Sequence, residues 1–148
     1  MAGKKKTRKK TTKKKKGKSV VARGKRKRCV ARATIRPGNG KVRFNHKLVD
    51  SCNNKYVREI ILEPIRYVGP EANDIDVSVN VNGGGEMGQA QAARTAIAKA
   101  LVLYFEKLDL KEKFLSIDRS LVTEDSRRVE PKKYKGPKAR ARYQKSYR

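Results

Sequence analysis

The sequence contains no acidic residue before Asp50, although its first 28 residues include 16 lysines and arginines. Acids are almost as rare in residues 127–148, where ten basic side chains face Glu130 alone. Only the middle, residues 29–126, is balanced, with 14 basic and 13 acidic groups, so the net charge of +26 resides at the two ends. The composition predicts one nearly neutral domain, long enough to bury a core, between two cationic segments that repel themselves.

Long apolar runs are also absent, which excludes several membrane interpretations. No stretch approaches the roughly 18 apolar residues that a membrane span needs. The basic N-terminus is not followed by the apolar stretch of a secretion signal. Residues 4–18 contain no leucine, isoleucine, phenylalanine or tryptophan that could enter a bilayer. We therefore expect no membrane partner, and a charge of this size then indicates nucleic acid.

Side chains that carry out catalysis or bind metals are few. Cys29 and Cys52 lack C-x-x-C spacing, which favours reduced structural thiols in a cytoplasmic protein. His46, the single histidine, lies in a predicted turn, and no nucleophile motif or metal-ligand cluster is evident. We expect no catalytic residue, no metal, no cofactor and no small-molecule substrate.

The pattern predicts a lysine-rich extension over residues 1–22, a globular domain over 23–126 and a tail over 127–148. Regular structure should begin near Lys27 and follow the order β-β-α-β-α-α-β, an α/β (α+β) class with helices on at least one face of a sheet. The expected strands are residues 29–36, 41–45, 75–82 and 121–123, the first two joined as a hairpin by the turn 37–40. The expected helices are residues 51–62, ended by Pro64, then 86–108 and 109–117.

Alanines fill the first half of the longest predicted helix, so it should lie close to the sheet. Before this helix, residues 83–88 satisfy the pattern G-x-G-x-x-G between a strand and a helix. A nucleotide-binding interpretation fails because the chain has room for one βαβ unit only. Close helix–strand packing explains the glycines better. A third interpretation is that the N–H groups here and Gln89 meet an RNA phosphate.

The first predicted strand places Arg28, Arg32 and Arg36 on one face, because side chains alternate with a period of two. Arg43 on the next strand and the segment Lys25, Arg26 and Lys27 extend this basic surface. A solvated sheet face normally mixes charge signs. An unbalanced one favours RNA contact.

The last fifteen residues, 134–148, combine six basic side chains with three tyrosines and contain no acid. They cannot build a core. Cationic and aromatic side chains together suit a polyanion with stackable bases. From Lys132 onward, a fully extended tail could reach about 55–60 Å, at roughly 3.3–3.6 Å per residue.

Three segments stand out together: Gly24-Lys-Arg-Lys27 with Val30-Ala-Arg-Ala33, then Gly83-Gly-Gly-Glu-Met-Gly-Gln-Ala90 with Ala93-Arg94, and the tail Ala139-Arg-Ala-Arg-Tyr-Gln-Lys-Ser-Tyr-Arg148. These segments resemble the small-subunit ribosomal protein S-nine family in its archaeal-type variant. Asp118-Arg119 and Asp125-Ser-Arg-Arg128 also fit. The chain departs from the family at Arg28-Cys29, where a small hydroxyl residue is usual, and at Asn45-His46-Lys47, where many members have Asn-Gly-Lys.

The resemblance implies a two-layer sandwich like domain two of ribosomal protein S-five, with a left-handed βαβ crossover. It also implies a place in the head of the small subunit, beside neighbouring head proteins, as a ribosomal protein of translation. The tail would contact peptidyl-site tRNA through Lys145, Ser146, Tyr147 and Arg148. Contacts to ribosomal RNA are expected from Lys25, Arg26, Lys27, Arg28, Arg32, Arg36, Arg43, Gln89, Arg94, Arg127, Arg128, Lys138, Arg140 and Arg142.

Two other classes remain open from the residues alone. The cationic segments would equally suit a free-standing RNA chaperone or a DNA-compacting protein. An enzyme acting on nucleotides rests only on the glycine run.

Overall fold

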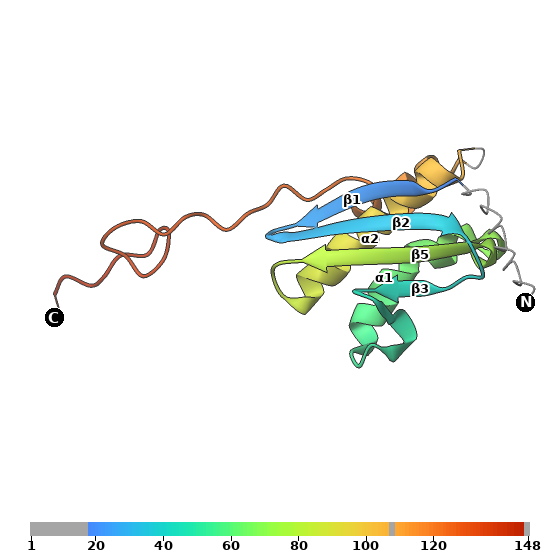
Figure 1. Ribbon diagram of the computed structural model, residues 1–148. Coiled ribbons are helices and arrows are strands. Elements are labelled where there is room, and N and C mark those ends of the chain that lie inside the picture. Colours follow the sequence, from blue (N-terminus) through green and yellow to red (C-terminus); the bar gives the residue numbers. More distant parts are fainter. Residues whose placement is uncertain (1–17, 107–108, 147–148) are drawn as a thin grey trace, which may run out of the picture.

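The computed structural model describes residues 18–106 and 109–146, which form a two-layer α/β domain with a projecting C-terminal tail (Figure 1). One layer is a five-stranded sheet, and the helices lie against one of its faces. The strands are β1 (Val20–Arg26), β2 (Cys29–Pro37), β3 (Val42–Phe44), β4 (Lys47–Leu48) and β5 (Ile75–Asn82). The helices are α1 (Lys55–Val68), α2 (Glu86–Tyr104) and α3 (Leu110–Ile117), with 3₁₀ turns η1 (Val49–Ser51), η2 (Pro70–Asp74) and η3 (Arg119–Leu121). The predicted mixed class is confirmed.

Regular structure begins at Val20, so the prediction that it begins near Lys27 is wrong. Strand β1 pairs antiparallel with β2 from Val20 opposite Ile35 to Arg26 opposite Cys29. The basic residues of this segment alternate with small or apolar ones, and Ala22 and Gly24 point inward. The surrounding lysines and arginines hide this alternation in the sequence. Residues 1–17 of the predicted extension lie outside the described residues.

The predicted hairpin between residues 29–36 and 41–45 is also wrong. The strand order is β1-β2-β5-β3-β4, so β5 lies between β2 and β3. Strand β5 is antiparallel to β2 and parallel to β3. Asp76 fixes the loop after β2. Its Oδ1 accepts hydrogen bonds from the backbone N–H groups of Asn39 (2.9 Å) and Lys41 (3.1 Å).

Strand β3 instead forms a short hairpin with β4, and its turn is Asn45-His46. Both residues have positive φ, 46° and 70°, as a two-residue hairpin turn requires. Glycine adopts this conformation without steric cost, whereas histidine does not. The turn geometry therefore places a strained backbone at His46.

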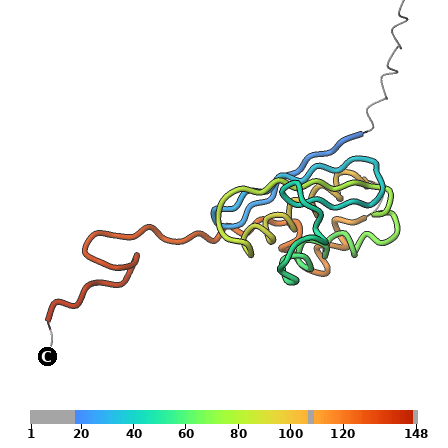
Figure 2. The backbone as a smooth tube through the Cα atoms, turned by 60° about the horizontal axis from the view of Figure 1, so that its bottom comes forward, coloured from blue at the N-terminus to red at the C-terminus, as the bar shows by residue number. Residues whose placement is uncertain are grey.

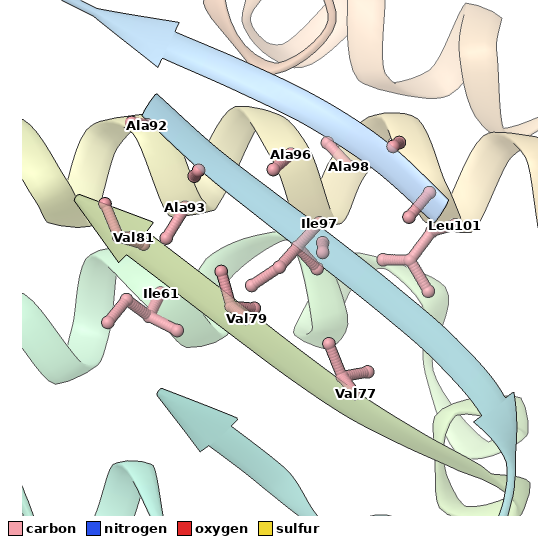
Figure 3. Close-up of a cluster of buried hydrophobic side chains, with 14 of the residues drawn as sticks. Ile61, Val77, Val79, Val81, Ala92, Ala93, Ala96, Ile97, Ala98 and Leu101 are labelled. Carbon is pink, nitrogen blue, oxygen red and sulfur yellow. The ribbon is translucent and has the colours of Figure 1, made fainter. Parts of the chain in front are cut away.

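The core lies between the sheet and the helices (Figure 3). Ile75, Val77, Val79 and Val81 alternate inward along β5, as the sequence predicts. Helix α2 turns Ala92, Ala93 and Ala96, each fully buried, into the same core. Small side chains permit a close approach: a Cβ added to Gly24 would lie 2.3 Å from the carbonyl oxygen of Ala92. The predicted close packing of the alanine-rich helix is confirmed.

Helix α1 begins after Asn54, whose Oδ1 accepts from the backbone N–H of Tyr56 (3.1 Å), and it continues through Pro64 to Val68. The predicted end before Pro64 is wrong. Proline removes one backbone hydrogen bond and strains a helix, but Ile61 and Pro64 are both buried. Burial of this face outweighs the local penalty.

The segment after α2 differs from its prediction in one respect. Helix α3 starts after Asp109 as expected, whereas residues 121–123 form no strand, because η3 occupies Arg119–Leu121. Leu121 is buried as a single apolar anchor, and Asp118 caps the turn by accepting from the backbone N–H of Ser120 (2.8 Å). Helix α2 ends at Tyr104 with Phe105 as its C-cap, so its predicted continuation through residues 105 and 106 is wrong; residues 107–108 lie outside the described residues.

The tail leaves the domain beside the β1–β2 turn and projects away from it (Figures 1 and 2). It is not straight along its length, since residues 134–142 form a loop that folds back on itself. The guanidinium of Arg142 donates to the carbonyl oxygen of Tyr134 (2.6 Å), and Arg140 donates to Glu130 (3.0 Å). This loop shortens the tail relative to the fully extended reach predicted from its length.

Candidate nucleic-acid interface

The face of the sheet that carries no helix presents basic side chains to solvent. We call it the open sheet face. In one row across the strands, Arg23 lies opposite Arg32, which lies opposite Asn80. In the next row, Thr34 and Ser78 separate Val21 from Arg43. Arg32 and Arg36 share this face because they are separated by an even number of residues along β2.

Within the described ranges, 18–106 and 109–146, none of the open-face arginines forms an ion pair with an acid of the chain. The arginines in question are Arg23, Arg32, Arg36 and Arg43. The acid opposite Arg36 is Asp76, but its carboxylate is occupied by the backbone of the β2–β3 loop. The N–H groups of Asn39 and Lys41 hold the pKa of the Asp76 carboxyl below its usual value. The nearby charge of Arg43 adds to the lowering of the Asp76 pKa, and one carboxylate among four arginines still leaves an excess of positive charge on this face.

Sequence reasoning missed Arg23, because it assigned residues up to 26 to the segment before the first strand. Arg23 and Arg32 form a direct cross-strand pair of like charges, which is unfavourable in an isolated sheet. Such a pair is stabilised when an anion lies between the two guanidinium groups. The alternation of the small residues Ala22 and Gly24 with Arg23 and Lys25 was the signal that could have found it.

Arg43 reaches the open face by a different route from the predicted one. It lies on β3, across β5 from Thr34, and not beside β2. Two strand spacings, about 9.5 Å, therefore separate Arg43 from β2. The predicted basic face exists, but it is wider than a hairpin would make it.

Arg94 and Arg26 are largely covered by partners within the domain. The Arg94 guanidinium, 15% exposed, donates to Glu63 (2.9 Å), Asp118 (2.8 Å) and Ser120 (3.0 Å). The hydroxyl and backbone N–H of Ser120, together with Arg94, lower the pKa of Asp118 to about 2. Arg26 contacts Asp125 and donates to Gln91 (2.9 Å). These two arginines stabilise the fold, so the interface we infer does not depend on them.

The glycine run is explained by packing. A Cβ on Gly83 would lie 2.6 Å from the carbonyl oxygen of Arg28, and one on Gly84 would lie 2.2 Å from Cys29 Sγ. Gly83 and Gly84 also have positive φ, 81° and 65°. Gln89 donates to the carbonyl oxygen of Gly83 (3.1 Å), so its amide braces the same loop. The loop and the β1–β2 turn therefore need glycine to approach each other.

An open groove lies between the β1–β2 turn and the start of α2. The turn presents Lys27, with φ of 53°, and Arg28, both exposed. The groove is lined by Arg26, Lys27, Arg28, Gly84, Gly85, Met87 and Val129, together with neighbouring residues of α2. Lys25, Lys27 and Arg128 also lie around the start of the tail. The predicted cluster Lys25–Arg28 is thus brought together with the first tail residues.

The remaining predicted residues lie along the tail, away from the sheet. Lys138, Arg140, Arg142, Lys145 and Ser146 are all exposed, and Arg127 is 81% exposed. Lys135 lies over the ring of Tyr134, 5.6 Å from its centroid. Tyr147 and Arg148 lie outside the described residues.

In the part of the chain that the structure describes, histidine, cysteine and acidic side chains do not gather in threes or more into a group that could hold a metal ion. None of the helices described is both long and apolar enough to cross a bilayer.

Comparison with known proteins agrees with the resemblance read from the motifs. The family described as Ribosomal protein S9/S16 matches residues 24–148. The small ribosomal subunit protein uS9 of Methanococcus maripaludis (strain C5) is 47% identical over 135 residues, which is 88% of this chain and 99% of that protein. The protein of the same name from Picrophilus torridus is 47% identical over 129 residues, 87% of this chain and 97% of that protein.

A basic α/β domain with a cationic tail is the class that the fold and the interface define. The chain belongs to the ribosomal protein S9/S16 family. It is accordingly a structural protein of the small ribosomal subunit, with a role in translation and with archaeal relatives.

Proposed function

We propose that the domain binds ribosomal RNA in the head of the small subunit through its open sheet face, and that the tail contacts peptidyl-site tRNA. The observation that carries the RNA-binding proposal is the absence, among the described residues, of acids paired with Arg23, Arg32, Arg36 and Arg43. Arginine offers planar, bidentate contacts to phosphate. Each contact also releases condensed counterions from the RNA.

The tail suits a second RNA partner beyond the reach of the domain. Its exposed cations are spaced along a segment that leaves the globular unit (Figure 2). Tyr134 and Tyr143 are 85% and 66% exposed, so their rings are available to stack on bases. Lys145 and Ser146, both exposed, belong to the last four residues, 145–148, which the family resemblance places nearest to the tRNA.

The finer architecture is part of the same proposal. Strands β3 and β5 are parallel and joined through α1, which is the kind of connection to which crossover handedness applies. We infer the left-handed sense and the kinship with domain two of ribosomal protein S-five from the family resemblance. Cytoplasmic ribosomes and neighbouring head proteins follow as its location and partners.

The test of the open sheet face is the double substitution Arg32→Glu with Arg36→Glu. It should weaken binding to small subunits reconstituted without this chain by about a hundredfold. The reason is that two positive charges facing phosphate become negative. The control is Lys55→Glu with Lys111→Glu, which changes the net charge equally at exposed helical positions away from this face. Normal incorporation of the first variant would refute the interface.

The same experiment separates this proposal from a free-standing RNA chaperone or DNA-compacting protein. Purely electrostatic, site-independent binding weakens steeply as salt rises. Co-sedimentation with small subunits that persists in high salt supports a ribosomal site. If the wild-type chain and the two double variants all dissociate from the subunits at moderate salt, a free-standing RNA chaperone or DNA-compacting protein would be favoured.

The tail is tested by deleting Lys145–Arg148. Assembly should proceed normally, because Lys145 and Ser146, the two deleted residues that the structure describes, form no hydrogen bond or ion pair with the domain there. Retention of tRNA in the peptidyl site should fall about tenfold, since two cationic side chains, Lys145 and Arg148, are lost. Filter binding of tRNA to the reconstituted subunits measures this, and unchanged affinity would remove the tail from the proposal.

A further inference from the structure

The start of the tail is tied to the domain at one acidic residue, Asp125. Its carboxylate contacts the Arg26 guanidinium from β1 and also accepts from Arg127 Nη2 (2.6 Å). Arg26 in turn donates to Gln91 of α2 (2.9 Å). We call Arg26, Gln91, Asp125 and Arg127 the tail-root cluster. It joins a strand, a helix and the tail at one point.

Two members of the cluster, Arg26 and Asp125, are largely hidden from solvent, which distinguishes their contact from ordinary surface ion pairs. The side chains of Arg26 and Asp125 are 19% and 21% exposed. One residue earlier, Glu124 accepts from Lys99 of α2 (2.8 Å), with 26% and 27% exposed. Reduced exposure limits screening and makes such contacts worth more than the usual surface pair. Successive acids thus fix the chain to α2 and then to β1.

Beyond the cluster, the described hydrogen bonds and ion pairs of the tail are internal to it. Glu130 pairs with Lys133 and Arg140, and Arg142 donates to Tyr134. Among the hydrogen bonds and ion pairs of residues 18–106 and 109–146, Asp125 and Arg127 are the last tail-side residues joined to the domain. The direction in which the tail leaves is therefore set at this position (Figure 1).

Charge makes Asp125 hard to replace. Lys25, Lys27 and Arg128 lie around the same point, in addition to Arg26 and Arg127. Without the Asp125 carboxylate these cations would repel one another and push the tail away from β1. The neutral amide of an Asp125→Asn variant would keep the side-chain volume but would not attract these cations.

We propose that Asp125 is a positioning residue, which fixes the direction of the cationic tail by neutralising the Arg26–Arg127 pair at its root. Its effect on tRNA rests on the proposed function of the tail. Its effect on tail order does not.

The first experiment uses ¹⁵N relaxation on the full-length chain to measure backbone order at Ser126, Arg127 and Arg128. In wild type these amides should be nearly as ordered as the domain, with order parameters near 0.8, and Asp125→Asn should lower them below about 0.6. The control is Asp50→Asn, an exposed acid that forms no ion pair among the described residues. Order retained at 126–128 in Asp125→Asn overturns the proposal.

A second variant guards against general loss of structure. Arg26→Gln should loosen residues 126–128 to the same degree, and the double variant with Asp125→Asn should be no looser than either single one. Ile97 in the core should keep its order in all three. Additive loosening, or loosening at Ile97 of the same size as at the tail root, would show a fold defect and overturn the positioning role.

The final readout uses reconstituted subunits. Asp125→Asn should incorporate normally and lower tRNA retention about tenfold, like the tail deletion. If both variants leave tRNA retention unchanged while Asp125→Asn still loosens the root, the proposed tRNA contact fails and the positioning role stands. If the deletion lowers retention but Asp125→Asn neither loosens the root nor affects tRNA, the positioning role fails and the tRNA contact stands.

Discussion

Arginines on the open sheet face and arginines beside α2 have the same chemistry but different partners. Arg32 and Arg36 point to solvent and pair with no acid among the described residues, whereas Arg94 is 15% exposed and contacts two carboxylates. The difference separates two uses of one residue type. A paired arginine stabilises the domain, and an unpaired one leaves charge for an external polyanion. In a chain of net charge +26, pairing is therefore more informative than position in the sequence.

The covered face of the sheet should tolerate almost no added volume, in contrast to the open one. Gly24→Ala places a Cβ 2.3 Å from the Ala92 carbonyl oxygen and 2.6 Å from the Ala96 backbone nitrogen, so β1 and α2 must separate. We expect a loss of about 3 kcal/mol in the free energy of unfolding, measured by urea denaturation.

The matched control is Gly85→Ala, at a glycine with open space around the added Cβ and a negative φ of −105°. It should be neutral or slightly stabilising. Equal effects at the two glycines would mean that helix α2 does not pack on β1 as described.

Removing a paired arginine should affect stability rather than RNA binding. Arg94→Met leaves Glu63 and Asp118 without their cation, and we expect about 2 kcal/mol of destabilisation, because the cluster is only partly buried. Arg66→Met, which removes the exposed partner of Glu59, should leave the free energy of unfolding almost unchanged. An Arg94→Met protein of wild-type stability would contradict the structural role.

Lowering the pH should weaken the same cluster, because Asp118 becomes protonated. Its pKa of about 2 is depressed by Ser120 and then by Arg94, so its contribution is present above pH 4. Stability is lost as the pH falls from about 4 through 2, and the partly exposed carboxylate accounts for roughly 1 kcal/mol of this loss. Asp118→Asn should flatten that part of the stability curve. An unchanged slope in denaturation from pH 5 to pH 2 would argue against it.

The smallest effect is expected at the β3–β4 turn. His46→Gly relieves the positive φ of 70° and should stabilise the domain by about 0.5 kcal/mol, after the entropic cost of glycine is subtracted. His46→Ala keeps the strain and should not stabilise. If alanine performs as well as glycine in thermal unfolding, the imidazole and not the backbone carries the cost.

Local patterns predicted those elements whose burial is periodic. The alternation of Ile75–Val81 and the alanine-rich face of α2 follow directly from side-chain period, and so does the shared face of Arg32 and Arg36. Strand β1 escaped prediction because its inward positions are small and its outward ones resemble the preceding lysine-rich segment. Pro64 and η3 were misread for the opposite reason: tertiary burial of Pro64 and Leu121 overrides the local signal.

Topology and pairing could not be predicted in the same way. Nothing local in residues 29–45 shows that β5 inserts between β2 and β3, because the partner comes from thirty residues further on. The roles of Arg26 and Arg94 depend on Asp125, Glu63 and Asp118, acids that are distant in sequence. Only the folded chain shows which arginines are already neutralised.

The most direct test of this difference is the salt dependence of binding to small subunits reconstituted without this chain. Neutralising an open-face arginine, in Arg23→Gln or Arg32→Gln, should reduce the slope of log affinity against log salt by about 0.7–0.9 each, as expected for one lost phosphate contact. Arg66→Gln, at an arginine already paired with Glu59, should leave the slope unchanged. Equal slopes for all three variants would contradict the claim that the unpaired arginines of the open sheet face bind RNA.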